Sequence, residues 1–301
     1  MTGPTKRAPA PRSHAARLGG LVLAAALLAA AGWVLARYTP DTIFEREGPF
    51  GRVRVVERHD GLRSLFIGAG RARQSALYPA RPRHLEFPYT KLGMVGLALT
   101  PPDGRILFVG LGGGAMPSYT RAVLPAARID VVEIDPLVVE VAQRFFGFRP
   151  DERMAVHTMD GRAFIEGAPA GSWDLIVLDA YSDDFIPYDL STRQFLEAVR
   201  TRLGPGGVVV SNLWSSNRAY PAMVATYAAV FAQVRLLHVP GRNQRILVAG
   251  GGGVPLDREA LVAAAEALDA RSPLGFDLAA MVEAGWEGRP HVHAPVLEDT
   301  S

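Results

Sequence analysis

Residues 105–115, with the sequence RILFVGLGGGA, and residues 129–135, with the sequence IDVVEID, decide the fold. The first segment is an apolar strand that runs into a glycine turn, and the second is an apolar strand that reaches the acidic residue Glu133. Glycines let the main chain pass close to a ligand at the start of a helix, and a carboxylate about 20 residues further on can accept both hydroxyl protons of a ribose. We therefore interpret Gly110, Gly112, Gly113 and Glu133 as nucleotide-binding residues.

Apolar strands alternate with helical segments after this stretch. The pattern predicts strands at 105–110, 129–134, 154–158, 173–179, 207–213, 234–239 and 244–249, and helices near 117–124, 136–146, 161–167, 191–203 and 218–232. Such alternation indicates a doubly wound, mostly parallel α/β sheet of the Rossmann-like type. A nicotinamide enzyme needs a second mononucleotide half, whereas here two close strands end the sheet. This ending favours a methyltransferase-like sheet with a reversed final strand, which suits a sulfonium nucleoside.

In the segment before the glycine turn, the residue pattern repeats with the shorter period that is typical of β-strands. Residues 52–56, RVRVV, alternate, and residues 64–67, SLFI, follow a turn at Gly61, which predicts a small antiparallel β domain over 42–100. Within it, residues 89–99 are apolar enough to form a helix that docks the sheet onto the next domain. We assign residues 101–255 to a sulfonium-nucleoside-binding α/β domain and residues 256–301 to a C-terminal helix and tail.

The N-terminus carries a second strong signal. Residues 1–17 form a basic Pro/Ala-rich tail, and residues 18–36 contain no charge. Nineteen uncharged residues can just span a bilayer, whereas a cleaved signal peptide fits the same pattern of basic start and apolar middle. We favour a retained transmembrane helix, and hence a single-pass protein of the bacterial cell membrane. The basic residues before the segment favour a cytoplasmic N-terminus, and the side of the catalytic domain stays open.

Composition excludes several classes of protein. The chain has 301 residues, 49% of them apolar, a formal net charge of +2 and no cysteine. No basic block is interleaved with aromatic residues, so we do not expect nucleic acid as a partner. The absence of cysteine excludes disulfides and thiolate sites, and the seven histidines show no ligand spacing, so we expect no metal. The sequence has no nucleophile elbow and no P-loop lysine.

Further acidic residues lie at the ends of the later strands. Asp160 and Gly161 close the third strand, where a carboxylate can accept a hydrogen bond from an adenine amino group, and Asp179 closes the fourth. Ligands of open sheets bind outside the carboxyl ends of the strands, so these residues and Glu133 are expected around one pocket. The polar residues 211–212 and 215–217 follow the fifth strand, and we interpret them as caps of the next helix rather than as ligand contacts.

The order of these motifs resembles the spermidine synthase family, the polyamine aminopropyltransferases, and in particular its membrane-anchored bacterial branch. The resemblance covers roughly residues 43–250, and residues 47–55, EGPFGRVRV, and 85–89, LEFPY, look like the small N-terminal domain of that family. It implies that Glu133 binds the ribose of decarboxylated S-adenosylmethionine, that Asp160 and Gly161 meet its adenine, and that Asp179 is the catalytic acid facing the amine. It also implies substrate contacts by Gln74 and Tyr89, and a homodimer.

In the implied reaction an amine displaces a sulfonium, and the substrate is putrescine or a related polyamine. A carboxylate such as Asp179 can bind and orient the amine and take its proton. Asp183 would add negative potential for a polycation, and Tyr181 would offer a cation–π face.

Three positions depart from the family pattern. The glycine loop of the family carries an aspartate where this chain has Ala115, the loop after Asp179 is longer, and Lys91 lies in the run where the family has a Glu and a His. Two alternative functions therefore stay open. One is a methyltransferase that uses intact S-adenosylmethionine, which a positively charged partner for the cofactor's carboxylate would support. The other is a membrane-tethered protein that binds a nucleoside or a polyamine without catalysis.

Overall fold

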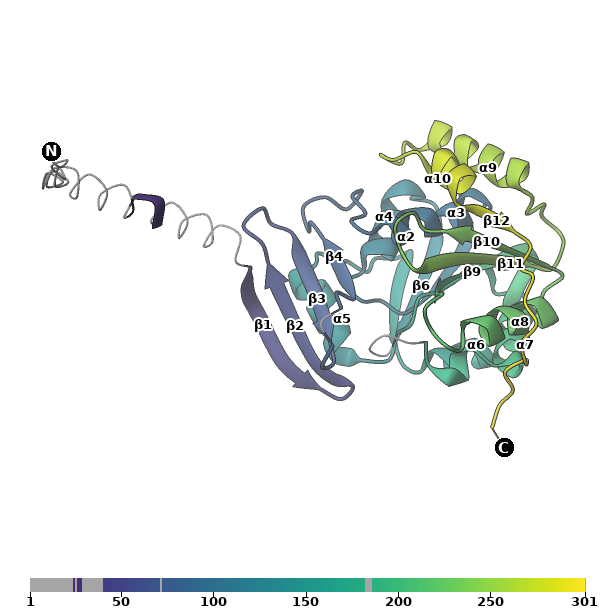
Figure 1. Ribbon diagram of the computed structural model, residues 1–301, viewed down its shortest axis with the longest axis horizontal. Helices are drawn as coiled ribbons and strands as arrows, with labels where there is room; N and C mark the ends of the chain where they lie inside the picture. Colours follow the sequence, from purple (N-terminus) through teal and green to yellow (C-terminus); the bar gives the residue numbers. More distant parts are fainter. Residues whose placement is uncertain (1–23, 25, 29–39, 71, 182–185, 301) are drawn as a thin grey trace, which may run out of the picture.

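The computed structural model describes residues 24, 26–28, 40–70, 72–181 and 186–300. Two sheets lie side by side in it: a small sheet near the N-terminus, drawn in purple and blue, and a larger sheet flanked by helices (Figure 1). The glycine turn and the acidic strand ends, which the sequence predicts to bind a nucleoside, all lie in the larger part. The small sheet closes one side of it.

The small sheet is an antiparallel meander of four strands. Its strands are β1 (Asp41–Gly48), β2 (Gly51–Glu57), β3 (Arg63–Ile67) and β4 (Ser75–Leu77), paired in that order. Because side chains alternate along a strand, β2 turns Val53 and Val55 to one face, where both are fully buried. They pack against Val138 and Val141 of α5 (Pro136–Phe145). This contact fixes the small sheet on the larger domain.

The larger sheet has eight strands in the order β12-β10-β11-β9-β8-β5-β6-β7. Its strands are β5 (Arg105–Val109), β6 (Arg128–Glu133), β7 (Met154–Thr158), β8 (Trp173–Leu178), β9 (Leu203–Trp214), β10 (Gln233–His238), β11 (Gln244–Gly250) and β12 (Trp286–Gly288). Strands β5 to β9 pair in parallel, whereas β11 runs antiparallel to β9, and β10 antiparallel to β11. The predicted Rossmann-like sheet with a reversed final strand is confirmed. The sequence did not predict the short edge strand β12.

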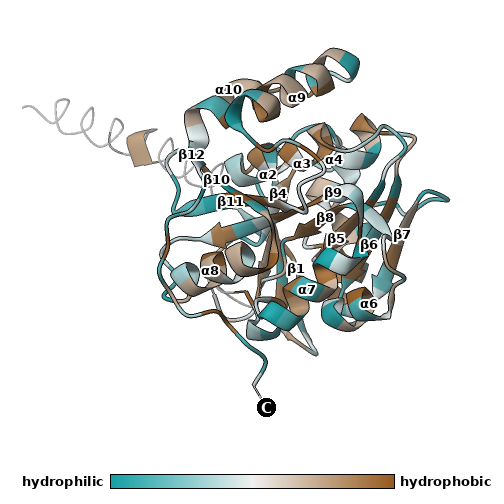
Figure 2. Ribbon diagram, turned by 90° about the vertical axis from the view of Figure 1, so that its right-hand side faces the viewer, coloured by the Kyte–Doolittle hydropathy of each residue, from teal (hydrophilic) through white to brown (hydrophobic). Residues whose placement is uncertain are grey.

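Helices cover both faces of this sheet (Figure 2). One face carries α2 (Pro88–Gly93), α3 (Val95–Ala98), α4 (Ala115–Val123), α9 (Arg258–Arg271) and α10 (Leu278–Gly285). The other carries α6 (Gly161–Gly167), α7 (Arg193–Arg202) and α8 (Tyr220–Val230). Strand β5 supplies both faces, since Ile106 and Phe108 join the first core and Leu107 and Val109 the second. Strands buried on both faces explain the continuous apolar runs in the sequence.

The prediction of a membrane protein needs correction. The longest helix in the described part of the chain, α9, has 14 residues and spans about 21 Å, which is short of the roughly 30 Å of bilayer hydrocarbon. None of the helices described here is long and apolar enough to cross a membrane. On this finding we withdraw the predicted single-pass localisation and the membrane as a partner. Apart from residues 24 and 26–28, the predicted helix at 18–36 lies outside the described residues.

Candidate active site

A cavity of about 400 Å³ opens at the carboxyl ends of β5, β6 and β8, beside β4 and α2. The chain leaves β5 for β6 on one side and later returns to β8 on the other, so this is the switch point where open α/β sheets bind ligands. The sequence-predicted residues that line it are Gln74, Tyr89, Gly110, Gly112, Glu133, Asp160, Gly161, Asp179 and Tyr181. Asp183 lies outside the described residues.

The glycine turn after β5 is shaped by close backbone contacts. Gly110 has φ +97°, and a Cβ there would lie 2.6 Å from the carbonyl oxygen of Asp179. Only glycine allows this approach between the ends of β5 and β8. A Cβ on Gly113 would lie 2.8 Å from Oγ of Ser75 in β4, and Gly113 does not line the cavity. Gly113 therefore packs the turn closely against the small sheet, and its predicted role as a cofactor contact stays a prediction.

Glu133 ends β6 beside the glycine turn. Its Oε2 accepts a hydrogen bond from the amide of Leu111 at 3.0 Å, and its Oε1 accepts one from the amide of Asp135 at 3.0 Å. Burial raises the pKa of Glu133, and the amide donors of Asp135 and Leu111 partly offset the rise. Each carboxylate oxygen has room for a second donor. Glu133 can thus accept two hydroxyl groups from a ligand while the amides hold it in place.

Asp160 and Gly161 form the start of α6 at the next strand end. Oδ1 of Asp160 caps the helix by accepting a hydrogen bond from the amide of Ala163 at 2.8 Å. A Cβ on Gly161 would lie 2.7 Å from Cγ1 of Val109, so glycine lets the helix start close to β5. Both residues line the cavity, as the sequence predicted, and Asp160 also has the structural role of a cap.

Asp179 follows β8 and lies in a network of neutral donors. The hydroxyl of Tyr89 donates to its Oδ2 at 3.3 Å, and Nδ2 of Asn212 donates to its Oδ1 at 3.1 Å. Burial raises the pKa of Asp179 to about 7, against the opposing effects of the donors Asn212 and Tyr89. The carboxyl group therefore changes its charge close to neutral pH, as a general base requires.

The lining of the cavity is acidic. Its carboxylates are Glu133, Asp135, Asp160, Asp179 and Asp189, and the described lining residues include no Lys, Arg or His. Lys91, which lies in the run where the family has a Glu and a His, is not among them, and its Nζ lies 5.9 Å from the ring centroid of Phe276. The cavity accordingly suits a cationic ligand.

Sequence reasoning missed one residue of the Asp179 network. Asn212, near the end of β9, was interpreted as a helix cap, but its side chain donates to Asp179. Oδ1 of Asn217 accepts a hydrogen bond from the amide of Ala219 at 2.8 Å in the turn before α8, and no side chain caps that helix, whose N-cap residue is Ala219. The only signal in the sequence was the position of Asn212 at the end of a parallel strand, which many polar residues share.

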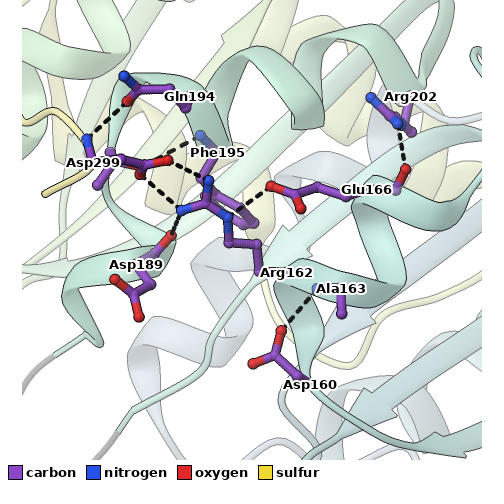
Figure 3. A network of polar contacts seen from close by, with 10 residues as sticks. Asp160, Arg162, Ala163, Glu166, Asp189, Gln194, Phe195, Arg202 and Asp299 are labelled. Atoms are coloured by element: carbon purple, nitrogen blue, oxygen red, sulfur yellow. Dashed lines mark hydrogen bonds and ion pairs between the residues drawn. The ribbon is translucent and has the colours of Figure 1, made fainter. Parts of the chain in front are cut away.

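A second missed element is the cavity wall formed by Pro187, Asp189 and Leu190. The short helix η1 (Tyr188–Leu190) is held by Arg162, the second residue of α6 (Figure 3). Arg162 donates to the carbonyl of Asp189 at 3.2 Å and to both oxygens of Asp299, at 2.8 and 2.6 Å. The C-terminal tail, 137 residues away along the chain, thus supports the wall of the cavity.

The expectations of no metal and of no nucleic acid stay predictions. In the part of the chain that the structure describes, no group of three or more His, Cys, Asp or Glu side chains could hold a metal ion.

The strand order, the glycine turn and the acidic strand ends together define a methyltransferase-like α/β domain with an attached β domain. Residues 90–242 match the spermine/spermidine synthase domain. The polyamine aminopropyltransferase of Vibrio vulnificus is 34% identical over 245 residues, which cover 79% of this chain and 82% of that protein. This chain belongs to the spermine/spermidine synthase family, which confirms the resemblance seen in the sequence.

Solved structures share the fold. A probable spermidine synthase from Corynebacterium glutamicum superposes with a TM-score of 0.66 at 20% identity, over 87% of this chain and all 100% of the other. Human methyltransferase-like protein 13, solved in complex with SAH, superposes with a TM-score of 0.56 at 30% identity, over 63% of this chain and 93% of the other. The fold is therefore shared by proteins named for two different transfer reactions.

Proposed function

We propose that this chain transfers an aminopropyl group from decarboxylated S-adenosylmethionine to putrescine or a related polyamine. The observation that carries the proposal is the acidic cavity, whose described lining has five carboxylates and no Lys, Arg or His. Both substrates are cations, and the decarboxylated cofactor has no carboxylate that would need a positive partner. Family membership and the identity to the Vibrio vulnificus aminopropyltransferase support the same reaction.

The nucleoside half of the cavity has the groups that this cofactor requires. Glu133 would accept the two ribose hydroxyl groups, and Asp160 with Gly161 would meet the adenine. A volume of about 400 Å³ lies within the range of small-molecule sites. Residues 101–255 would form the nucleoside-binding unit, and residues 42–100 would close it from the side of Gln74 and Tyr89.

The reaction needs a deprotonated amine and a fixed alignment. The amine nitrogen attacks the methylene carbon next to the sulfonium sulfur and forms the new C–N bond. The C–S bond breaks, its electron pair stays on sulfur, and the leaving group departs as an uncharged thioether that needs no general acid. Asp179, with its pKa of about 7, takes the proton that the amine nitrogen loses. Alignment in the cavity supplies much of the remaining acceleration.

Methyl transfer from intact S-adenosylmethionine is the second candidate. The observations that favour it are Ala115 in the lining, where the family pattern has an aspartate, and the 30% identity to the human methyltransferase-like protein. The absence of a cation from the described lining argues against it, since the carboxylate of the intact cofactor would then face an acidic wall. The homodimer stays a further proposal, because the structure describes one chain.

Calorimetric titration of the full chain with each cofactor tests the proposal. We expect decarboxylated S-adenosylmethionine to bind at least about tenfold more tightly than the intact cofactor, because one repelled carboxylate is worth more than about 1.4 kcal/mol in a buried acidic site. Tighter binding of the intact cofactor would reject the proposal in favour of methyl transfer. The variant Lys91→Met serves as a control, because Lys91 does not line the cavity.

A further inference from the structure

The network behind Asp179 continues through two amide side chains. Nδ2 of Asn212 donates to Oδ1 of Asp179 at 3.1 Å, and Nε2 of Gln244 donates to Oδ1 of Asn212 at 3.3 Å. Both amides are buried, with exposed fractions of 5% for Asn212 and 7% for Gln244. They come from neighbouring antiparallel strands, β9 and β11, and neither lines the cavity. A series of hydrogen bonds thus leads from the cavity into the sheet.

The donor and acceptor chemistry of the side chains fixes the direction of these hydrogen bonds. An Asn side chain has an oxygen that accepts and a nitrogen that donates, and it can in principle lie either way round. With Gln244 donating, a flipped Asn212 would place two NH₂ groups together and its oxygen against the carboxylate. The ionised carboxylate of Asp179 can only accept, so Nδ2 of Asn212 faces it, and the donor from Gln244 stabilises this orientation by satisfying Oδ1 of Asn212.

The backbone of Asn212 is held as well. The hydroxyl of Tyr181 donates to the carbonyl oxygen of Asn212. The titratable groups that face Asp179 from the elements packed around it are the hydroxyls of Tyr89 on α2 and Tyr181 after β8, and no charged side chain of the described residues contributes to the pKa of Asp179. Asn212 is consequently a principal stabiliser of the ionised form of Asp179.

We propose that Asn212 and Gln244 are positioning residues for Asp179, which hold its carboxylate in one orientation and in its ionised form for the amine. The inference deepens the proposed function and rests on it for its catalytic meaning. Tyr89 and Asn212 each take one oxygen of the carboxylate, so the remaining lone pairs are left for the reacting amine. Gln244 acts one step further back, through the orientation of Asn212.

We therefore expect substitutions of the two amides to change the pH dependence of turnover to different extents. Asn212→Leu keeps the size of the side chain and removes the donor, so the pKa of Asp179 rises further. Turnover then falls by roughly tenfold on the acidic side of the pH profile and by much less on the alkaline side, where the carboxyl group is ionised again. Gln244→Met produces a smaller loss of the same form. A purely structural role of either amide would lower turnover equally at every pH.

A ¹³C NMR titration of the Asp179 carboxyl group, assigned with Asp179→Asn, tests the inference without any turnover. We expect Asn212→Leu to raise the measured pKa of Asp179, Gln244→Met to raise it less, and Gln233→Met to leave it unchanged. Gln233 is the matched control, because it is an amide at the far end of the same hairpin and bonds to the carbonyl of Val254. An unchanged pKa in Asn212→Leu, with the fold intact by thermal melting, would overturn the inference. Failure of the proposed function would instead show as wild-type protein that titrates as expected and transfers no aminopropyl group.

Discussion

The hydroxyl of Tyr89 donates a hydrogen bond of 3.3 Å to Oδ2 of Asp179, although 90 residues separate them in the chain. Helix α2 thereby places a phenol directly on the carboxyl group that closes β8. Tyr89→Phe removes this donor and leaves the ring. We expect turnover to fall by roughly 3- to 30-fold near neutral pH, because the carboxylate loses one of its two side-chain donors. Steady-state kinetics at a pH about two units higher should recover most of the rate; an equal loss at both values would contradict this reading.

Asp179 also links activity to stability. Its pKa of about 7 in the folded chain lies above the ordinary value of 3.8, so the folded state binds more protons than the unfolded state between these two values. The stability of the free protein therefore falls as the pH rises through this window. We expect Asp179→Asn to abolish turnover and to raise the free energy of unfolding by about 1–3 kcal/mol above pH ~7. Chemical denaturation of both proteins at acidic and alkaline pH measures the difference, and a variant that is less stable at alkaline pH would refute the link.

Glu133 is expected to act in binding rather than in the chemical step. Glu133→Gln keeps the shape but removes the charge that strengthens hydrogen bonds to ribose hydroxyl groups. We predict a loss of about 10- to 100-fold in affinity for 5′-methylthioadenosine, the thioether product, with a much smaller change in kcat. Calorimetry and kinetics on the same preparation separate the two effects. A large fall in kcat with unchanged affinity would place Glu133 elsewhere in the mechanism.

The ion pair between Arg162 and Asp299 is expected to hold the cavity wall. The Arg162 guanidinium holds the pKa of Asp299 at about 2, so the pair persists at all neutral and mildly acidic pH values. Asp299→Asn should raise KM for the nucleoside cofactor several-fold while kcat changes little, because Arg162, which tethers Tyr188–Leu190 through the carbonyl of Asp189, loses the ion pair that fixes its position. Asp299→Glu should restore most of the KM. As a control, Glu259→Gln alters an exposed acid far from this wall, and an identical rise in KM there would count against the prediction.

Gly110 offers a test of the turn itself. Gly110→Ala combines φ +97° with a Cβ that lies 2.6 Å from the carbonyl oxygen of Asp179. We expect a loss of about 2–4 kcal/mol in the free energy of unfolding. The matched control is Gly61→Ala, which has φ +84° and nothing within 4 Å of its Cβ, and should lose only about 1 kcal/mol. Equal losses in the two variants would show that the contact with Asp179 contributes nothing.

The sequence predicted the sheet well for a physical reason. Strands buried on both faces, such as β5 and β8, appear as continuous apolar runs. Glu133, Asp160 and Asp179 stand at the carboxyl ends of β6, β7 and β8, which a parallel sheet brings to one edge. Residues fixed by this topology could be placed without a structure.

Residues that depend on side-chain direction could not be placed in this way. Asn212 lies near the end of β9 and its amide points to Asp179, and a Cβ on Gly113 would lie 2.8 Å from Oγ of Ser75, whereas the nearest atom of Ser75 to a Cβ on Gly112 would lie 3.6 Å away. Lys91 lies in the run where the family has a Glu and a His, but its Nζ lies over the ring of Phe276. Asp299 supports the cavity wall from the far end of the chain, and no local pattern signals such a long-range contact.

The most direct test of the central claim is one reaction that contains the full chain, putrescine and equal concentrations of decarboxylated and intact S-adenosylmethionine. Mass spectrometry of the products distinguishes an aminopropylated amine with 5′-methylthioadenosine from a methylated product with S-adenosylhomocysteine. The acidic cavity predicts that the aminopropylated amine and the thioether form together, and that Asp179→Asn forms neither. Methylated product without aminopropyl transfer would contradict the account.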